Sequence, residues 1–175
     1  PDSAQFVLAN LIRMVKHLQQ HRMIHRDLKL ENIVLNAKGN LKLVDFGFAK
    51  IFDIGKELRT RTRCGTPEYA APEVYKGEHY KAFPVDIWSV GIIAYIIMTG
   101  GFPFYKKNKS ELRREIVNKE PSYELPCFQG DLQSTSVRMK SCIQGLLQKN
   151  PDRRLTVNEL ENHEALNELN LDIIK

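Results

Sequence analysis

Residues 25–32 read HRDLKLEN, and residues 45–47 read DFG. Between them lie two short apolar runs, 33–35 and 41–44, separated by the turn sequence NAKGN. Two such runs joined by a polar turn that contains glycine predict a β-hairpin. We therefore expect a hairpin that separates two polar motifs.

Helical patterns flank this hairpin on both sides. Upstream, apolar residues recur at the helical period over residues 6–17. Downstream, Asp86 could cap a helix that runs to Met98 and is closed by Gly100. That helix is apolar nearly all round, which is typical of a helix in the middle of a core.

Three further helices are expected in the last third of the chain. The first two would run from Ser110 to Val117 and from Ser136 to Leu147, and the third would begin at a capping box formed by Thr156 and Glu159. Residues 46–73 show no clean period and are interpreted as a long ordered loop. The predicted fold is mainly α, with helices around a central buried helix and one β-hairpin.

Composition limits the class of protein. The chain has 175 residues, of which 42% are hydrophobic and 27% charged, so wholesale disorder and a fibrous repeat are unexpected. Its length suits one domain. The net charge of +5 is compatible with nucleic acid, but no interleaving of aromatic and basic residues supports that partner. The Cys and His spacing does not match a metal site.

Targeting signals and cysteine usage point to the inside of the cell. No secretory signal opens the chain, and the longest apolar stretch, 87–98, is too short for a membrane span. Three widely spaced cysteines argue against a disulfide framework and suit a reducing compartment. We therefore expect a cytoplasmic or nuclear location.

A third motif, APE at residues 71–73, completes an ordered set with HRD and DFG. In this order and context the chain resembles a eukaryotic-type Ser/Thr protein kinase from Phe6 to about Leu166. The resemblance implies the helical C-terminal lobe of a kinase domain. Residues 1–166 would form this partial domain and residues 167–175 a C-terminal tail.

The resemblance also implies the roles of the polar residues. Asp27 would be the catalytic base that accepts the substrate hydroxyl proton, and Lys29 would neutralise the transferred phosphate of ATP. Asn32 and Asp45 would supply oxygen ligands to Mg²⁺, and Val34 would lie beneath the adenine ring. Any one of these polar residues alone would be better read as a turn or cap former.

Several other residues would support the site. His25 could be an acid or base, but the resemblance favours a packed ring that stacks on Phe46. Asp86, with Trp88 nearby, would steady the catalytic loop from below. Glu73 would form a buried structural ion pair with Arg154, in the run NPDRR.

The stretch LRTRTRCGTPEY, residues 58–69, resembles an activation segment. Thr62 would be its phosphorylation site, with Arg26 and Lys50 as phosphate ligands and an upstream activating kinase as partner. Thr66 would hydrogen-bond Asp27 and Lys29. The simpler interpretation of the segment's arginines is a solvated basic stretch.

The sequence mixes features of two kinase groups. The LVDFGFAK and CGTPEY stretches are similar to cyclic-nucleotide-dependent kinases, whereas DIWSVG through YIIM is similar to the calmodulin-dependent group. Leu30 replaces a common proline. Glu31 could contact a basic residue before the target Ser or Thr of a protein substrate.

A glycine-rich loop, a strand lysine and its partner glutamate belong to the same signature but are not found, because only 24 residues precede His25. Two hypotheses follow. In the first, the chain is a fragment of an ATP-dependent kinase whose small lobe lies upstream, and the isolated chain is inactive. In the second, it is a catalytically silent lobe that binds or scaffolds other proteins.

Overall fold

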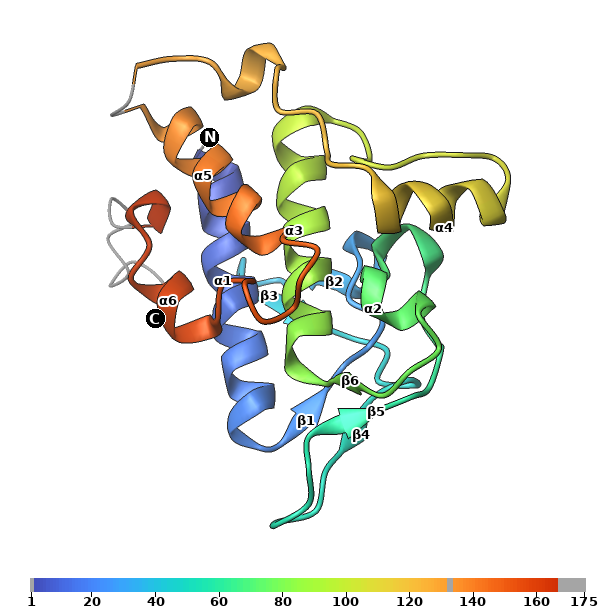
Figure 1. Ribbon diagram of the computed structural model, residues 1–175. Helices are drawn as coiled ribbons and strands as arrows, with labels where there is room; N and C mark the ends of the chain where they lie inside the picture. Colours follow the sequence, from blue (N-terminus) through green and yellow to red (C-terminus); the bar gives the residue numbers. More distant parts are fainter. Residues whose placement is uncertain (1, 132–133, 167–175) are drawn as a thin grey trace.

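The computed structural model describes residues 2–131 and 134–166 (Figure 1). The α-helices are α1 (Asp2–Gln20), α2 (Pro72–Tyr75), α3 (Phe83–Thr99), α4 (Lys109–Asn118), α5 (Thr135–Leu146) and α6 (Val157–Glu161). Four 3₁₀ turns add η1 (Leu30–Asn32), η2 (Pro67–Tyr69), η3 (Pro126–Phe128) and η4 (Glu164–Leu166). The strands are β1 (Met23–Ile24), β2 (Ile33–Leu35), β3 (Leu41–Leu43), β4 (Lys50–Ile51), β5 (Arg59–Thr60) and β6 (Tyr80–Lys81). The expected tail, 167–175, lies outside the described residues.

Helix α3 is the centre of the fold, as the sequence predicted. It packs against α1 and α5, and Figure 1 shows these three helices side by side. Trp88 and Ile92 on α3 are completely buried, because apolar side chains surround this helix on all sides. No helix in the described part of the chain is long and apolar enough to cross a membrane.

The predicted start of α3 was wrong. The helix begins at Phe83, so Asp86 lies inside its first turn rather than at its cap. Pro84 suits this start, because the fixed φ of proline matches a helix and its missing N–H is not needed there. Gly100 closes the helix in the left-handed region, with φ of 77°.

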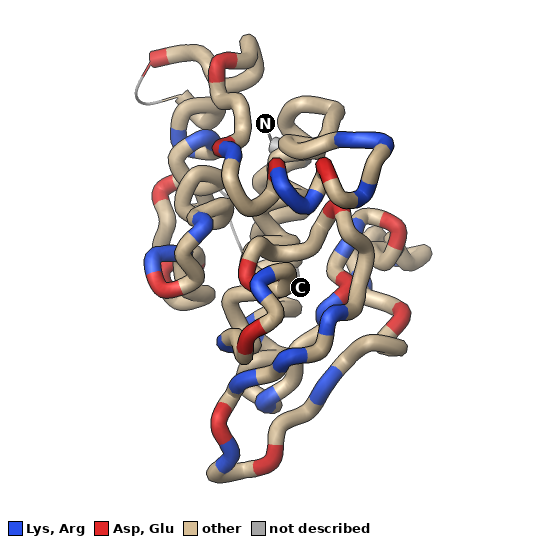
Figure 2. Tube along the Cα trace, turned by 45° about the vertical axis from the view of Figure 1, so that its right-hand side comes forward, with Lys and Arg blue, Asp and Glu red and all other residues tan. Residues whose placement is uncertain are grey.

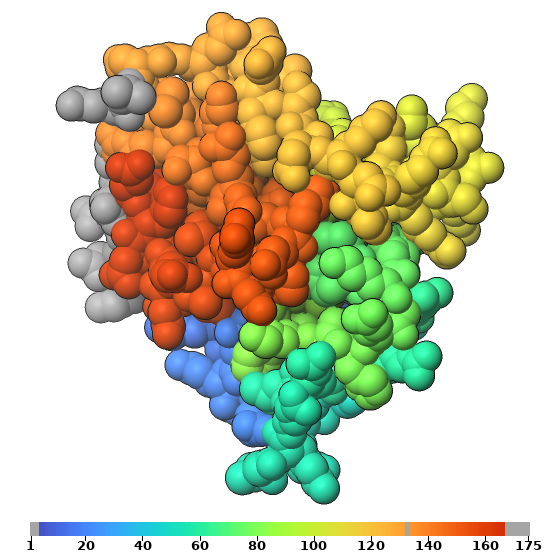
Figure 3. All heavy atoms as spheres, in the orientation of Figure 1, coloured from blue at the N-terminus to red at the C-terminus, as the bar shows by residue number. Residues whose placement is uncertain are grey.

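The predicted hairpin is confirmed, whereas the prediction of a long loop over residues 46–73 is wrong in part. Strands β2 and β3 pair antiparallel, with Ile33 opposite Leu43. Within residues 46–73, however, β4 pairs with β1, and β5 pairs with β6. These two-residue strands are formed by pairing with distant segments, so no local period reveals them. The chain between β4 and β5 projects from the lower end of the molecule (Figure 3).

Side-chain caps determine where the helices α4, α5 and α6 begin. Asn108 caps α4 and Ser134 caps α5, each two residues before the serine expected to start the helix. Each accepts hydrogen bonds from free N–H groups of the first turn, which stabilises a helix by about 1 kcal/mol. The capping box of Thr156 and Glu159 is confirmed at the start of α6.

Candidate active site

The loop between β1 and β2 is held from below by Asp86 on α3. Its two carboxylate oxygens accept hydrogen bonds from the backbone N–H groups of His25, at 2.7 Å, and Arg26, at 2.9 Å. Arg26 has φ of 69°, a left-handed conformation that costs of order 1–3 kcal/mol. Burial raises the pKa of Asp86, although both N–H groups act in the opposite direction. Asp86 therefore fixes the backbone that presents Asp27.

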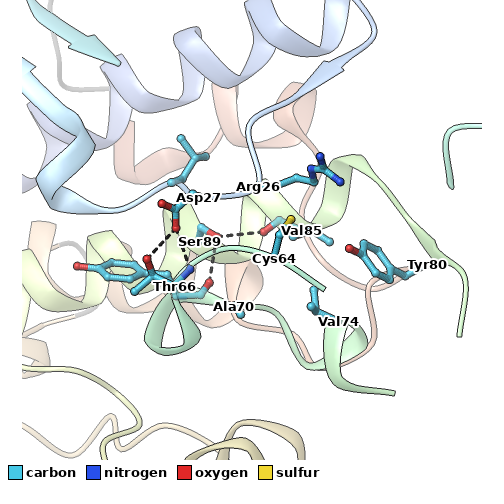
Figure 4. Close-up of a pocket in the computed structure, with 11 residues that line it drawn as sticks. Arg26, Asp27, Cys64, Thr66, Ala70, Val74, Tyr80, Val85 and Ser89 are labelled. Carbon is cyan, nitrogen blue, oxygen red and sulfur yellow. Dashed lines mark hydrogen bonds between the residues drawn. The ribbon is translucent and has the colours of Figure 1, made fainter. Parts of the chain in front are cut away.

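Three groups converge on the carboxylate of Asp27, and Figure 4 shows the contact with Thr66. Its Oδ1 accepts hydrogen bonds from the N–H and the hydroxyl of Thr66, both at 2.8 Å. Its Oδ2 lies 2.9 Å from Nζ of Lys29, which also donates to Oγ1 of Thr66 at 3.0 Å. Burial opposes ionisation of Asp27, but the hydrogen bonds from Lys29 and Thr66 outweigh it and lower its pKa. Asp27 is therefore ionised at neutral pH.

The ion pair with Asp27 also changes the pKa of Lys29. The hydrogen bond to Asp27 is the main reason why the pKa of Lys29 is raised above its ordinary 10.5. The side chain therefore keeps its positive charge at neutral pH, beside the carboxylate. A fixed cation at this position can stabilise negative charge that develops on a transferred group.

Two oxygen-bearing side chains lie beside this centre. Asn32 donates from Nδ2 to the backbone oxygen of Asp27 at 3.0 Å, which orients its amide. The backbone N–H of Val44 donates to the carbonyl of Asn32 at 2.9 Å, and this bond brings Asp45 next to the loop. Asp45 has φ of 60°, and its Oδ1 accepts from the N–H of Gly47 at 3.2 Å.

The oxygen atoms of these two side chains fit a magnesium ion whose other ligands are water and substrate phosphates. Amide and carboxylate oxygens are hard donors, and Mg²⁺ is usually held by one or two carboxylates together with water and substrate phosphates. Across the described residues no group of three His, Cys, Asp or Glu side chains is placed to hold a metal. An all-protein metal cage is therefore not formed by this part of the chain.

His25 is a structural residue of the loop. Its ring is completely buried and meets the ring of Phe46 edge to face, with centroids 4.9 Å apart, as the sequence predicted. Nδ1 accepts from the N–H of Asp27 at 3.3 Å and Nε2 lies 3.2 Å from the oxygen of Val44. Nδ1 thus fixes the conformation within the loop, and Nε2 holds the loop to the segment that precedes Phe46.

The protein kinase domain family matches residues 1–166. The chain belongs to the protein kinase domain family. It is 35% identical over 153 residues to the serine/threonine-protein kinase SIK2 of Gallus gallus, covering 87% of this chain and 18% of that protein. The rat kinase SIK1 is 34% identical over the same length. The carbon catabolite-derepressing protein kinase of Secale cereale is 35% identical over 162 residues, which cover 93% of this chain and 30% of that protein.

The chain thus spans less than a third of the length of these curated relatives. Their names identify them as protein kinases, SIK1 and SIK2 as serine/threonine-specific. For this chain the comparison establishes membership of the family and agrees with a mainly helical fold with few strands.

The segment expected to be an activation segment ends at Glu73, which forms a buried ion pair with Arg154. Arg154 contacts Glu73 through both ends of its guanidinium, at 2.7 Å and 3.0 Å, and also donates to the oxygen of Pro84. Both side chains are almost completely buried. A bidentate pair of this kind fixes the relative position of α2 and the loop before α6.

Arg26 and Lys50, the expected ligands of a phosphate on Thr62, make other contacts in the structure. Thr62 is exposed, and its Oγ1 lies 3.4 Å from that of Thr60. Arg26 donates from Nε to the oxygen of Phe48 at 2.6 Å, and Nζ of Lys50 lies 4.7 Å from the ring centroid of Phe52. Within the described residues no hydrogen bond joins Arg26 or Lys50 to Thr62, so the expected phosphate ligands are not assembled in this structure.

Val34 and Glu31, expected to contact the adenine ring and the substrate, lie at the edges of the site. Val34 lies on β2 with 39% of its surface exposed. Oε2 of Glu31 accepts from the hydroxyl of Tyr69 at 3.4 Å, so the carboxylate is partly engaged within the site.

Sequence reasoning missed the residues that support the activation segment from inside. A cavity of about 10 Å³ lies beside Asp27, between the catalytic loop, η2 and α3 (Figure 4). Across it, the hydroxyl of Ser89 donates to the oxygen of Tyr69 at 3.0 Å. The hydroxyl of Tyr80 donates to the oxygen of Thr62. Ser89 lies in an apolar run and Tyr80 lies between His79 and Lys81, so no sequence signal marked either residue.

Proposed function

We propose that the chain is the catalytic large lobe of an ATP-dependent protein serine/threonine kinase. The observation that carries this proposal is the convergence of Lys29 and Thr66 on the ionised carboxylate of Asp27, with Asn32 fixed to the same loop. A scaffold that only binds proteins has no chemical need of this arrangement. Membership of the protein kinase family supports the same conclusion.

Asp27 acts on the hydroxyl of a protein substrate. Because its pKa is lowered, the carboxylate is available as an acceptor throughout the neutral range. It orients the serine or threonine hydroxyl through a hydrogen bond and takes its proton as phosphate is transferred. Thr66 holds one oxygen of Asp27, and the substrate hydroxyl would approach the other oxygen, beside Lys29. Lys29 then balances the charge of the transferred phosphate.

ATP with Mg²⁺ would supply the phosphoryl group and the charge that neutralises it. Asn32 and Asp45 are the residues that would hold the metal, and Val34 would contact the base. The surface around them exposes large apolar side chains from β2 to β4. These are Leu35, Val44, Phe46, Phe48 and Ile51. We infer that a small lobe covers this surface in the intact kinase, and that residues 1–175 alone have negligible turnover.

Regulation and substrate choice belong to the same proposal. Thr62 is exposed and available to an activating kinase. Phosphate at Thr62 would carry about −1.5 to −2 charge at pH 7 and would draw Arg26 and Lys50 from their present contacts. Glu31 would favour substrates with a basic residue before the target hydroxyl. An intracellular location agrees with this role.

The decisive experiment measures transfer of labelled phosphate from ATP to a basic peptide containing serine. The protein is the product of the complete coding sequence, as wild type, Asp27→Asn and Asp53→Asn. We expect Asp27→Asn to reduce transfer by about 10²- to 10⁴-fold. Asp53→Asn, in the loop after β4, serves as the matched control and should retain activity. Absence of transfer by the wild-type protein would refute the kinase proposal and favour the protein-binding alternative.

A further inference from the structure

Three arginines of the activation segment make a repeated contact with the segment that returns to β6. Nη2 of Arg59 donates to the backbone oxygen of His79 at 2.7 Å. Nε of Arg61 donates to the oxygen of Gly77 at 3.0 Å. Nη2 of Arg63 donates to the oxygen of Tyr75 at 3.3 Å.

These contacts follow the register of an antiparallel pair. Each step of two residues forward, from 59 to 61 to 63, is matched by a step of two residues back, from 79 to 77 to 75. In extended backbone, residues two apart lie on the same face. The three guanidinium groups therefore form one row along one side of the segment. Lys and Arg positions recur along the extended chain at the lower end of the molecule in Figure 2.

Arg59 lies within the backbone ladder of β5 and β6, whereas Arg61 and Arg63 lie beyond it. Backbone pairing between β5 and β6 is limited to Arg59 with Lys81 and Thr60 with Tyr80. Beyond Thr60 and Tyr80, Arg61 and Arg63 contact backbone oxygens of the other segment through their side chains. We propose that Arg59, Arg61 and Arg63 form a side-chain ladder that positions the activation segment over Asp27. Its role in catalysis rests on the proposed kinase function.

The ladder closes the loop of residues 63–75, which contains Thr66. Backbone pairing alone closes the loop from 60 to 80, whereas the rung from Arg63 to Tyr75 closes it from 63 to 75. The shorter loop loses less conformational entropy when it is ordered. Thr66, with its two hydrogen bonds to Asp27, lies only three residues beyond the last rung. Loss of the rungs should therefore loosen Thr66 before it affects the core.

The guanidiniums bind neutral carbonyl oxygens of the backbone, and Nε of Arg59 also lies 3.6 Å from Oε1 of Glu57. Arg61 and Arg63 border an open groove of about 590 Å³ together with Thr62 and Gly77. Because these rungs are exposed to solvent, each contributes only modestly to stability.

Gly77 offers a second way to disturb the ladder. A Cβ at this position would lie 2.8 Å from Nη2 of Arg63. Gly55 has nearly the same backbone conformation, with φ of 79° against 78° at Gly77, but a Cβ there would meet nothing within 4 Å. An alanine at either position is strained by the left-handed backbone. Only Gly77→Ala also pushes on the arginine.

The test is hydrogen–deuterium exchange of backbone amides in the product of the complete coding sequence, without ATP or substrate. Arg61→Ala with Arg63→Ala should raise exchange of the Thr66 N–H about tenfold, while amides of α3 and the thermal midpoint stay unchanged. Arg63→Lys retains a donor and a charge, so it should restore part of the protection that Arg63→Ala loses. Unchanged exchange at Thr66 in the double variant would overturn the ladder.

The glycine variants check that the contact itself is responsible. Gly77→Ala should raise exchange at residues 62–66 more than Gly55→Ala does. In an Arg63→Ala background, Gly77→Ala should add less than it does in the wild type, because the colliding guanidinium is gone. Equal effects in both backgrounds would contradict the proposal. Since no activity is measured, a failure of the proposed kinase function would leave these results intact, and the reverse also holds.

Discussion

The N–H and the hydroxyl of Thr66 both donate to a single carboxylate oxygen of Asp27, each at 2.8 Å. Through this contact the activation segment reaches the catalytic loop across 39 residues of sequence. Lys29 bonds to both partners, so the three side chains form a closed triangle. The position of Asp27 thus depends on the conformation of a segment that a phosphate could reorganise.

Removal of the Thr66 hydroxyl should weaken catalysis without unfolding the protein. Thr66→Val keeps the shape of the side chain but loses its bonds to Asp27 and Lys29. We expect transfer by the product of the complete coding sequence to fall about tenfold, the equivalent of one or two hydrogen bonds. Thr66→Ser retains the hydroxyl and should stay close to wild type. Equal losses in the two variants would show that the hydroxyl is not responsible.

The pair of Glu73 and Arg154 should dominate the stability of the lobe. Glu73→Ala leaves a buried guanidinium unpaired, so the free energy of unfolding should fall by about 3–5 kcal/mol. The matched control is Asp152→Ala, which removes an ion pair of 2.7 Å with Lys81 whose side chains are more than half exposed. That variant should lose at most about 1 kcal/mol. Urea denaturation of each variant compares them directly, and similar losses would contradict the argument.

Lys149 should make stability depend on pH. Its Nζ donates to the oxygen of Ile116 at 2.7 Å and lies 4.1 Å from the ring centroid of Phe104. Burial lowers the pKa of Lys149 to about 8, and Arg154 acts in the same direction whereas Glu120 opposes it. Above pH 8 the unfolded lysine therefore binds more protons than the folded one, and stability should rise with pH.

The variant Lys149→Met tests this effect, because it keeps the packing and removes the titrating group. The free energy of unfolding of the wild type should rise relative to that of the variant from pH 8 to about 9.5. Higher pH is avoided because ionisation of tyrosines, such as Tyr75 with its pKa raised by burial to about 12, acts in the opposite direction. A constant difference between the two proteins would rule out the lowered pKa.

The proposed metal ligands predict how nucleotide binding responds to Mg²⁺. In the product of the complete coding sequence, Mg²⁺ should strengthen binding of ATP to the wild-type protein and to Asp53→Asn. Asp45→Asn removes the carboxylate that would hold the ion, so Mg²⁺ should no longer strengthen binding. Calorimetric titration with and without the ion measures the difference. A full response in Asp45→Asn would exclude Asp45 as a ligand.

The sequence by itself determined the elements that depend on local pattern. The period of α1, the all-apolar α3, the hairpin of β2 and β3 and the capping box at Thr156 all follow from spacing along a few turns or strands. The order of HRD, DFG and APE identified the family, because side chains that carry chemistry must recur at fixed spacing. The contact of His25 with Phe46 followed from the same resemblance, although the rings meet edge to face rather than stacked.

Tertiary structure decided what depends on segments far apart in the chain. The start of α3 at Phe83 left Asp86 free to hold the backbone of the catalytic loop. The short strands β4 and β5 exist only because β1 and β6 pair with them. The arginines of the activation segment look like a solvated basic stretch, yet their guanidiniums bind carbonyls of the returning chain. A hydrogen bond between distant residues has no local period, so only the folded chain reveals it.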